Sequence, residues 1–288
     1  MNDAPRRSFA ARGGPALFRR SWSGSAPAER VVALLHGLGE HSGRYDDFAQ
    51  FLASRGATVH AYDQRGHGRS EGPRCDTPSF DHLVDDLARF LRVVRREESG
   101  RPLVLLGHSV DGLIAGALLA RGEPGIAAAV LVAPALQLPD WWGTPRETIG
   151  RIARALAPRF PVRTGVEPYE LSRDPETVAA YVADPLVRFH MSLRLGAALL
   201  DGIEDLQGRA GEIRIPVLLA HGECDPLTPL EPIRRFAGGL QPAGSELRIY
   251  PDMRHEILNE LGRADVYRDI ADWIDARTNG RTRAEVPS

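Results

Sequence analysis

Residues 103–120 read LVLLGHSVDGLIAGALLA. An apolar run, Leu103–Leu106, leads into a turn that carries Ser109, and a second apolar run follows it. The pattern predicts a strand, a sharp turn and a helix, with the serine hydroxyl exposed at the apex of the turn. The N–H group of Val110 would then lie at the helix N-terminus, where it can stabilise an oxyanion. Ser109 is therefore the candidate nucleophile, and Val110 is a candidate oxyanion donor.

Apolar runs of similar length recur along the chain, and we predict that they are strands. They are Val31–Leu35, Thr58–Tyr62, Ala129–Val132, Val217–Ala220 and Leu247–Tyr250. Continuous apolar runs are typical of strands that are covered on both faces. Between them, Ser79–Glu98 and Asp265–Arg277 have apolar residues at helical spacing. Alternating strands and helices predict an α/β fold, with a mainly parallel sheet flanked by helices and ligands bound beyond the carboxyl ends of its strands.

The alternation is interrupted between residues 136 and 206, where helical signals follow one another without an intervening strand. Thr144–Glu147 has the form of a capping box, and Asp174 and Asp184, each followed by proline, bracket a further helix. We interpret this block as a helical cap inserted into the core. The predicted division is a core of 1–135 and 207–277, a cap of 136–206 and a disordered polar tail of 278–288.

The composition excludes several classes of function. The formal net charge is -2, so the overall charge does not favour a nucleic-acid partner. All 36 residues in the Lys+Arg total are arginine, and without lysine the chain can form no Schiff base and no Walker-type phosphate contact. Two cysteines, Cys75 and Cys224, are too few for a disulfide framework. We expect no cofactor and no metal.

The N-terminal pair Arg6-Arg7 is not followed by the apolar stretch of about 7–15 residues that an export signal needs. No run elsewhere approaches the roughly 18 apolar residues of a membrane span. These observations predict a soluble, cytoplasmic protein.

A nucleophilic serine needs a base, and the base needs an acid that orients it. Asp225 follows the predicted strand Val217–Ala220, and His255 follows the predicted strand Leu247–Tyr250. Serine, aspartate and histidine in this chain order, each after a strand, are typical of catalysis on such a sheet. Asp252 is the rival acid, but it precedes the histidine too closely to face it easily.

A second oxyanion donor is expected from the loop after Val31–Leu35, where glycines flank Leu38 and let its backbone approach the nucleophile. His36, Glu40 and His41 in the same loop allow an alternative interpretation as metal ligands, although no further ligand set accompanies them. The later segment DQRGHG (63–68) is expected to brace the loops through Asp63 and Arg65 rather than to react.

Together these motifs resemble the monoacylglycerol lipase branch of the α/β-hydrolases, also described as lysophospholipase-like or serine-aminopeptidase-like. The resemblance spans nearly the whole chain. It is carried by HGLGEHSGRY (36–45), DQRGHGRSEG (63–72), the Ser109 turn, LSRDPETVAAYVADPL (171–186), HGECDPLTP (221–229) and YPDMRHEILNE (250–260). The first and fourth segments are fairly specific to this branch, and the others are shared more widely.

The resemblance implies the α/β-hydrolase fold and hydrolysis of monoacylglycerols, or similar small esters, through an acyl-enzyme. It implies a triad of Ser109, Asp225 and His255 and oxyanion donors at Leu38 and Val110. The residues that it places around a glycerol head group are Glu40, Arg44, His108 and Tyr181. It also implies that the cap lines an acyl tunnel and touches membrane transiently. Trp141 and Trp142 fit an interfacial anchor, although the neighbouring apolar stripe can equally pack on the sheet.

The sequence departs from the family at Asp111, where the Ser109 turn normally has glycine. The carboxylate either points aside near the helix N-terminus, strains the turn or lies near the developing oxyanion and slows catalysis. We therefore expect esterase activity that is retained but altered. The alternatives that stay open are a lysophospholipid, a short-chain or aryl ester, an amide substrate and, because of Asp111, a ligand-binding protein without activity.

Overall fold

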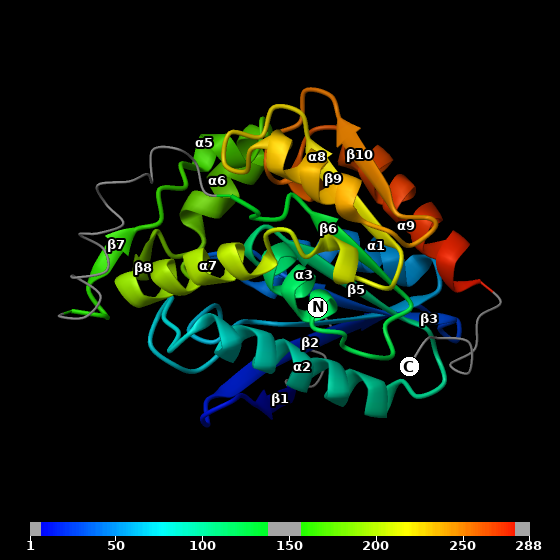
Figure 1. Cartoon of the computed structure of the whole chain (residues 1–288), viewed down its shortest axis with the longest axis horizontal. Coiled ribbons are helices and arrows are strands. Elements are labelled where there is room, and N and C mark those ends of the chain that lie inside the picture. The colour runs from blue at the N-terminus through cyan, green and yellow to red at the C-terminus, as the bar shows by residue number, and fades with distance from the viewer. Residues whose placement is uncertain (1–6, 138–156, 280–288) are drawn as a thin grey trace.

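The computed structural model describes residues 7–137 and 157–279 of the chain. Its centre is an eight-stranded sheet with the strand order β1-β2-β4-β3-β5-β6-β9-β10 (Figure 1). In this sheet β4, β3, β5, β6, β9 and β10 pair in parallel, and only the pairs β1–β2 and β2–β4 are antiparallel. The predicted mainly parallel sheet is therefore confirmed.

The six predicted strands are all present, and each is slightly longer than the apolar run that predicted it. They are β3 (Arg30–Leu35), β4 (Ala57–Tyr62), β5 (Leu103–His108), β6 (Ala128–Val132), β9 (Val217–Gly222) and β10 (Glu246–Tyr250). Successive side chains of a strand point to opposite faces. Thus Val31 and Ala33 of β3 pack on one side of the sheet, whereas Val32 and Leu34 pack on the other. Burial on both faces explains why these runs are continuously apolar.

Helices cover both faces of the sheet (Figure 1). Side chains of α2 (Phe80–Glu97), α3 (Val110–Ala120), α7 (Leu193–Leu206) and α8 (Leu230–Gly239) share one hydrophobic core. On the opposite face, α1 (Asp46–Ser54) and α9 (Arg263–Thr278) share the other. The amphipathic stretches predicted around α2 and α9 are therefore helices. Short 3₁₀ turns lie at η1 (Ser42–Tyr45), η3 (Ala210–Glu212) and η4 (Ile257–Asn259).

The sequence reading missed two strands at the N-terminal edge, β1 (Arg7–Ala10) and β2 (Ala16–Ser23). β2 has a buried residue only at Leu17 and Arg19, with half-buried or exposed residues between them. A strand that is fully covered on one face only needs no continuous apolar run. Its arginines and serines therefore hid it from a search for such runs.

The region between the two parts of the core contains α5 (Pro168–Leu171), α6 (Pro175–Ala183) and α7. α6 begins after Asp174, whose side chain accepts the N–H of Glu176, and it ends before Asp184, as predicted. The prediction that no strand intervenes between 136 and 206 was wrong. β7 (Pro161–Arg163) and β8 (His190–Ser192) form a two-stranded antiparallel sheet there. Each has three residues, too few for a periodic signal.

Thr144–Glu147, Trp141 and Trp142 lie outside the described residues, so the first cap helix and the interfacial anchor stay predictions. The domain boundaries likewise stay predictions. Within residues 7–137 and 157–279 no helix is long and apolar enough to cross a membrane.

Candidate active site

The Ser109 turn joins β5 to α3 with the backbone of the serine in an unusual conformation. Ser109 has φ of 55° and ψ of −119°, outside the regions that L-residues normally occupy. Glycines on both sides permit the close approach of strand and helix. A Cβ atom at Gly107 would lie 2.4 Å from the carbonyl oxygen of Asp111, and one at Gly112 would lie 2.9 Å from Cβ of Pro134. Strain at a single residue that is held by tight neighbours is typical of a functional site.

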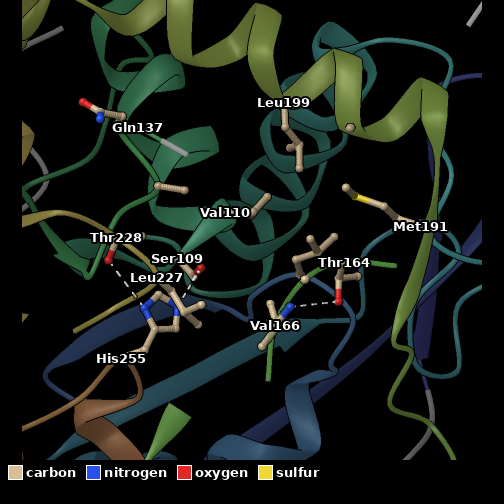
Figure 2. Close-up of a pocket in the computed structure, with 14 residues that line it drawn as sticks. Ser109, Val110, Gln137, Thr164, Val166, Met191, Leu199, Leu227, Thr228 and His255 are labelled. Atoms are coloured by element: carbon tan, nitrogen blue, oxygen red, sulfur yellow. Dashed lines mark hydrogen bonds between the residues drawn. The ribbon is translucent and has the colours of Figure 1, made fainter. Parts of the chain in front are cut away.

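The three predicted triad residues form a continuous hydrogen-bonded chain. Nε2 of His255 lies 2.9 Å from Oγ of Ser109 (Figure 2), and Nδ1 of His255 lies 2.8 Å from Oδ2 of Asp225. Because a carboxylate only accepts, Nδ1 carries the proton and Nε2 is free to accept from the serine hydroxyl. The rival Asp252 is exposed, and the position that it would need on His255 is taken by Asp225.

Asp225 is fixed by its own loop after β9. Its Oδ1 accepts the N–H groups of Leu227 and Thr228, at 2.8 and 3.1 Å, and the Thr228 hydroxyl donates to Oδ2. Burial alone would raise the pKa of Asp225, but the charge and hydrogen bond of His255 lower it to about 2. Burial alone would lower the pKa of His255, but Asp225 outweighs it, so that the pKa of His255 is raised. This pair favours an imidazolium at the moment when the serine proton arrives.

The loop after β3 reaches the nucleophile at Gly37. A Cβ atom at that residue would lie 3.3 Å from Cβ of Ser109. The next residue, Leu38, lines the same pocket as Ser109 and Val110. One predicted oxyanion donor therefore comes from the loop after β3 and the other from the first residue of α3, and both lie beside the serine.

A largely apolar pocket opens at Ser109 and His255 (Figure 2). It encloses about 590 Å³, part of which is open to solvent. Its lining includes Met191 and Leu199, which Figure 2 shows across the pocket from His255. A pocket that is apolar except for a few convergent polar groups suits a small molecule with an apolar chain.

The family model described as "Serine aminopeptidase, S33" matches residues 26–262, which is most of the chain. The chain belongs to this family. Its curated relatives include a monoacylglycerol lipase of Mycolicibacterium smegmatis, with 35% identity over 93% of this chain and 95% of the relative. The human monoglyceride lipase is 30% identical over 95% of this chain and 91% of its own length.

Among solved structures, the monoacylglycerol lipase of Paleococcus ferrophilus superposes with a TM-score of 0.82. It is 30% identical and covers 91% of this chain and 99% of its own. These comparisons confirm the predicted α/β-hydrolase fold, the resemblance to the monoacylglycerol lipase branch and the prediction of a serine ester hydrolase.

Four further residues of this S33 family member were predicted to surround the head group of the substrate. Glu40, Arg44, His108 and Tyr181 do come together, but none of them is among the residues that line the described pocket. Arg44 pairs with Glu40, and its guanidinium lies 4.6 Å from the ring centre of Tyr181. His108 lies behind the triad, with its ring centre 4.9 Å from that of His255.

The residues that allowed a metal site are engaged elsewhere. The ring nitrogens of His36 bond to the carbonyl of Gly37 and the N–H of Gln64, and Nε2 of His41 lies 2.8 Å from Asp184. In the part of the chain that the structure describes, no group of three His, Cys, Asp or Glu side chains could hold a metal ion. Asp63 accepts from Ser42 and from the N–H of Arg69, which suits its predicted bracing role.

Asp111 stands where the resemblance leads us to expect glycine. It does not strain the backbone at its own position, because it lies within the helix α3. Its carboxyl group is 1% exposed, and neither oxygen has a hydrogen-bond partner among the described residues. Burial raises the pKa of Asp111 well above its usual range, which His67 opposes and Glu40 reinforces. The side chain therefore favours its uncharged form, so it does not add a stabilising charge to the helix N-terminus.

Sequence reasoning missed two residues that support the triad, Thr228 and Glu256. Thr228 follows Asp225 by three residues, a spacing at which a hydroxyl commonly bonds to a nearby carboxylate. This spacing could have identified Thr228 from the sequence. Glu256 contacts Arg44, which is 212 positions earlier, and no local pattern could reveal this pair.

Proposed function

We propose that this chain hydrolyses monoacylglycerols, or similar small carboxylic esters, to a fatty acid and an alcohol. The observation that carries the proposal is the hydrogen-bonded chain from Asp225 through His255 to Ser109, which opens on an apolar pocket. The names of the relatives support the substrate class, because two curated relatives and one solved structure are lipases of this kind.

In the proposed reaction, Oγ of Ser109 attacks the ester carbonyl carbon while its proton passes to Nε2 of His255. The N–H groups of Leu38 and Val110 hold the resulting oxyanion. The tetrahedral intermediate collapses, the bond to the alcohol oxygen breaks, and His255 returns the proton to the leaving alcohol. Water, deprotonated by the same histidine, then attacks the acyl-enzyme, which releases the acid and restores the serine hydroxyl.

The proposal is tested by Ser109→Ala. Ser54→Ala is the matched control, because that serine is exposed at the end of α1 and its hydroxyl donates to the carbonyl of Phe51. We expect Ser109→Ala to lower kcat by about 10⁴-fold or more. It should also abolish labelling by a fluorophosphonate probe without lowering the melting temperature. The Ser54→Ala control should keep the wild-type kcat and the labelling by the probe. Full residual activity in Ser109→Ala would contradict the assignment of the nucleophile.

The same assay, run with a monoacylglycerol, a lysophospholipid and a p-nitrophenyl ester, separates the substrate classes. We expect the highest kcat/KM on the monoacylglycerol. A preference for the lysophospholipid would instead favour the lysophospholipase alternative. Contact of the cap with a membrane surface is part of the proposal, since such esters partition into lipid, and co-sedimentation with lipid vesicles measures it.

A further inference from the structure

Arg44 lies at the centre of a buried network behind the triad. Its Nη2 donates to Oε2 of Glu256 at 2.7 Å, and its Nη1 donates both to Oε1 of Glu256 and to Oε2 of Glu40. Pairing both terminal nitrogens with one carboxylate gives a bidentate geometry, which fixes direction as well as distance. We call this set of three side chains the Arg44 network. Its two acids are 2–3% exposed.

Each carboxylate of the Arg44 network is attached to a segment that the reaction needs. Glu256 directly follows His255 in the chain. Oε1 of Glu40 accepts the N–H of Gly37 at 2.6 Å, and Gly37 immediately precedes Leu38, the proposed oxyanion donor. A rotation of either loop would therefore break a buried, charge-assisted hydrogen bond.

Two other contacts tie the Arg44 network to its surroundings. The Tyr45 hydroxyl donates to Oε1 of Glu40, and His108, the residue before the nucleophile, lies 2.8 Å from the same hydroxyl. The Tyr181 ring of α6 covers the guanidinium at a distance typical of a cation–π contact. Arg44 thus joins four parts of the site. They are the loop after β3, the loop that carries His255, the Ser109 turn and α6.

The oxygens of both carboxylates are occupied by these partners. Oε2 of Glu256 also accepts from Asn259 at 3.1 Å. Burial opposes ionisation of Glu40, but Arg44 and next His108 hold the pKa of Glu40 well below its usual range. Two carboxylates against one guanidinium leave one net negative charge beside His255. Glu256 and Glu40 accordingly contribute to the raised pKa of His255, after Asp225.

We propose that Glu40, Arg44 and Glu256 are positioning residues that hold the Leu38 amide and His255 in register with Ser109, instead of binding the alcohol part of the substrate. This role rests on the proposed esterase function. Kinetics can distinguish this role from alcohol binding, because the alcohol has left before deacylation begins. A residue that binds the alcohol affects acylation of one class of ester, whereas a positioning residue affects acylation and deacylation of every ester.

The test uses Arg44→Lys, which keeps the charge but loses the bidentate geometry, and the nearly isosteric Glu256→Gln. Single-turnover kinetics are measured with a p-nitrophenyl ester and a glycerol ester of the same acid, which form the same acyl-enzyme. We expect Arg44→Lys to slow acylation by both esters, and deacylation, by about tenfold to a hundredfold with little change in KM. For Glu256→Gln we expect the acid limb of kcat/KM to move to lower pH, since a charge that raises the pKa of His255 is lost.

Arg65→Lys is the matched control. Arg65 makes an equally buried bidentate pair with Asp86, at 2.7 and 2.9 Å, away from the triad. Arg65→Lys should lower the melting temperature without slowing deacylation or moving the acid limb of kcat/KM. Loss confined to the glycerol ester in the Arg44 variant, with deacylation unchanged, would overturn the positioning role and assign the arginine to alcohol binding. A wild-type chain that reacts with neither ester nor a fluorophosphonate would overturn the esterase proposal itself, and the positioning role with it.

Discussion

Glu40 and Asp111 are both acidic, both 1–2% exposed and both close to the Ser109 turn, but their surroundings differ. Glu40 receives hydrogen bonds from Gly37, Arg44 and Tyr45, whereas the oxygens of Asp111 have no partner in the described residues. The pKa of Glu40 is lowered and that of Asp111 is raised. Burial acts in the same direction on both carboxyls, so the hydrogen-bond donors and the cation decide which one is charged.

The two carboxyl groups also influence each other. The negative charge of Glu40 adds to the raised pKa of Asp111, after burial as the main cause. Ionising Asp111 would place a second, unpaired charge in the same buried region, which is costly in a low dielectric. An ionised Glu40 therefore helps to keep its neighbour neutral. Truncating each acid to alanine should consequently change stability in opposite directions.

The largest effect on the free energy of unfolding is expected for Glu40→Ala. Removing Glu40 takes an acceptor from the buried N–H of Gly37 and from the Tyr45 hydroxyl, and each buried polar group left unpaired costs about 1–3 kcal/mol. Chemical denaturation at neutral pH measures the free energy of unfolding. Glu231→Ala is the control, because Glu231 pairs with Arg235 while their side chains are 68% and 64% exposed, and such pairs contribute about 0–1 kcal/mol. Equal losses in the two variants would show that Glu40 has no special role.

The next effect, of opposite sign, is expected for Asp111→Ala. A buried carboxyl without partners costs about 1–3 kcal/mol, so its removal should stabilise the fold by a similar amount. The gain should depend on pH. The folded state holds a proton on Asp111 that the unfolded chain releases above its ordinary pKa of 3.8, so the penalty grows as pH rises. Melting temperatures between pH 4 and 8 should diverge from wild type with rising pH, and a constant difference would contradict the uncharged state.

The pH dependence of Glu40→Ala sharpens the comparison. Because the folded-state pKa of Glu40 is lowered, its contribution is complete above the ordinary glutamate value of 4.5 and is lost as pH falls below it. The destabilisation caused by Glu40→Ala should thus shrink in acid. As the pH falls, the stability of Glu40→Ala rises towards that of wild type, and the stability gained in Asp111→Ala declines towards it.

The same contrast explains how far the sequence could predict this molecule. Strands such as β3 and β5 are apolar on both faces, so their runs alone revealed them, and chain order brought Ser109, Asp225 and His255 to one edge of the sheet. β2, which is fully covered on one face only, lacked that signal, and β7 and β8 were too short to carry one. The family resemblance supplied Glu40 and Arg44, but not their partner Glu256.

Charge states lay beyond sequence reasoning for a physical reason. The sequence shows that Asp111 replaces a glycine, and a carboxylate near a helix N-terminus is ordinarily favourable. Its actual state depends on whether donors come within hydrogen-bond reach once the chain is folded. Glu40, only a few residues before Arg44 and Tyr45, acquires its donors locally, whereas Asp111 acquires none among the described residues.

The smallest effect concerns turnover, and it is expected for Asp111→Gly. Asp111 follows Val110, whose N–H group is a proposed oxyanion donor, so an ionised Asp111 would oppose the developing negative charge. While the group stays protonated this opposition is absent, and the glycine variant should match wild type within about twofold near pH 6. At any pH at which the wild-type carboxyl ionises, the glycine variant should become the faster enzyme. Turnover of a short p-nitrophenyl ester, followed from pH 6 to 9, measures the ratio, with Asp111→Asn as the uncharged control of similar size. Ratios that stay at one over the whole range, in both variants, would mean that the carboxyl stays uncharged throughout, whereas a ratio far from one near pH 6 would contradict the uncharged state of Asp111.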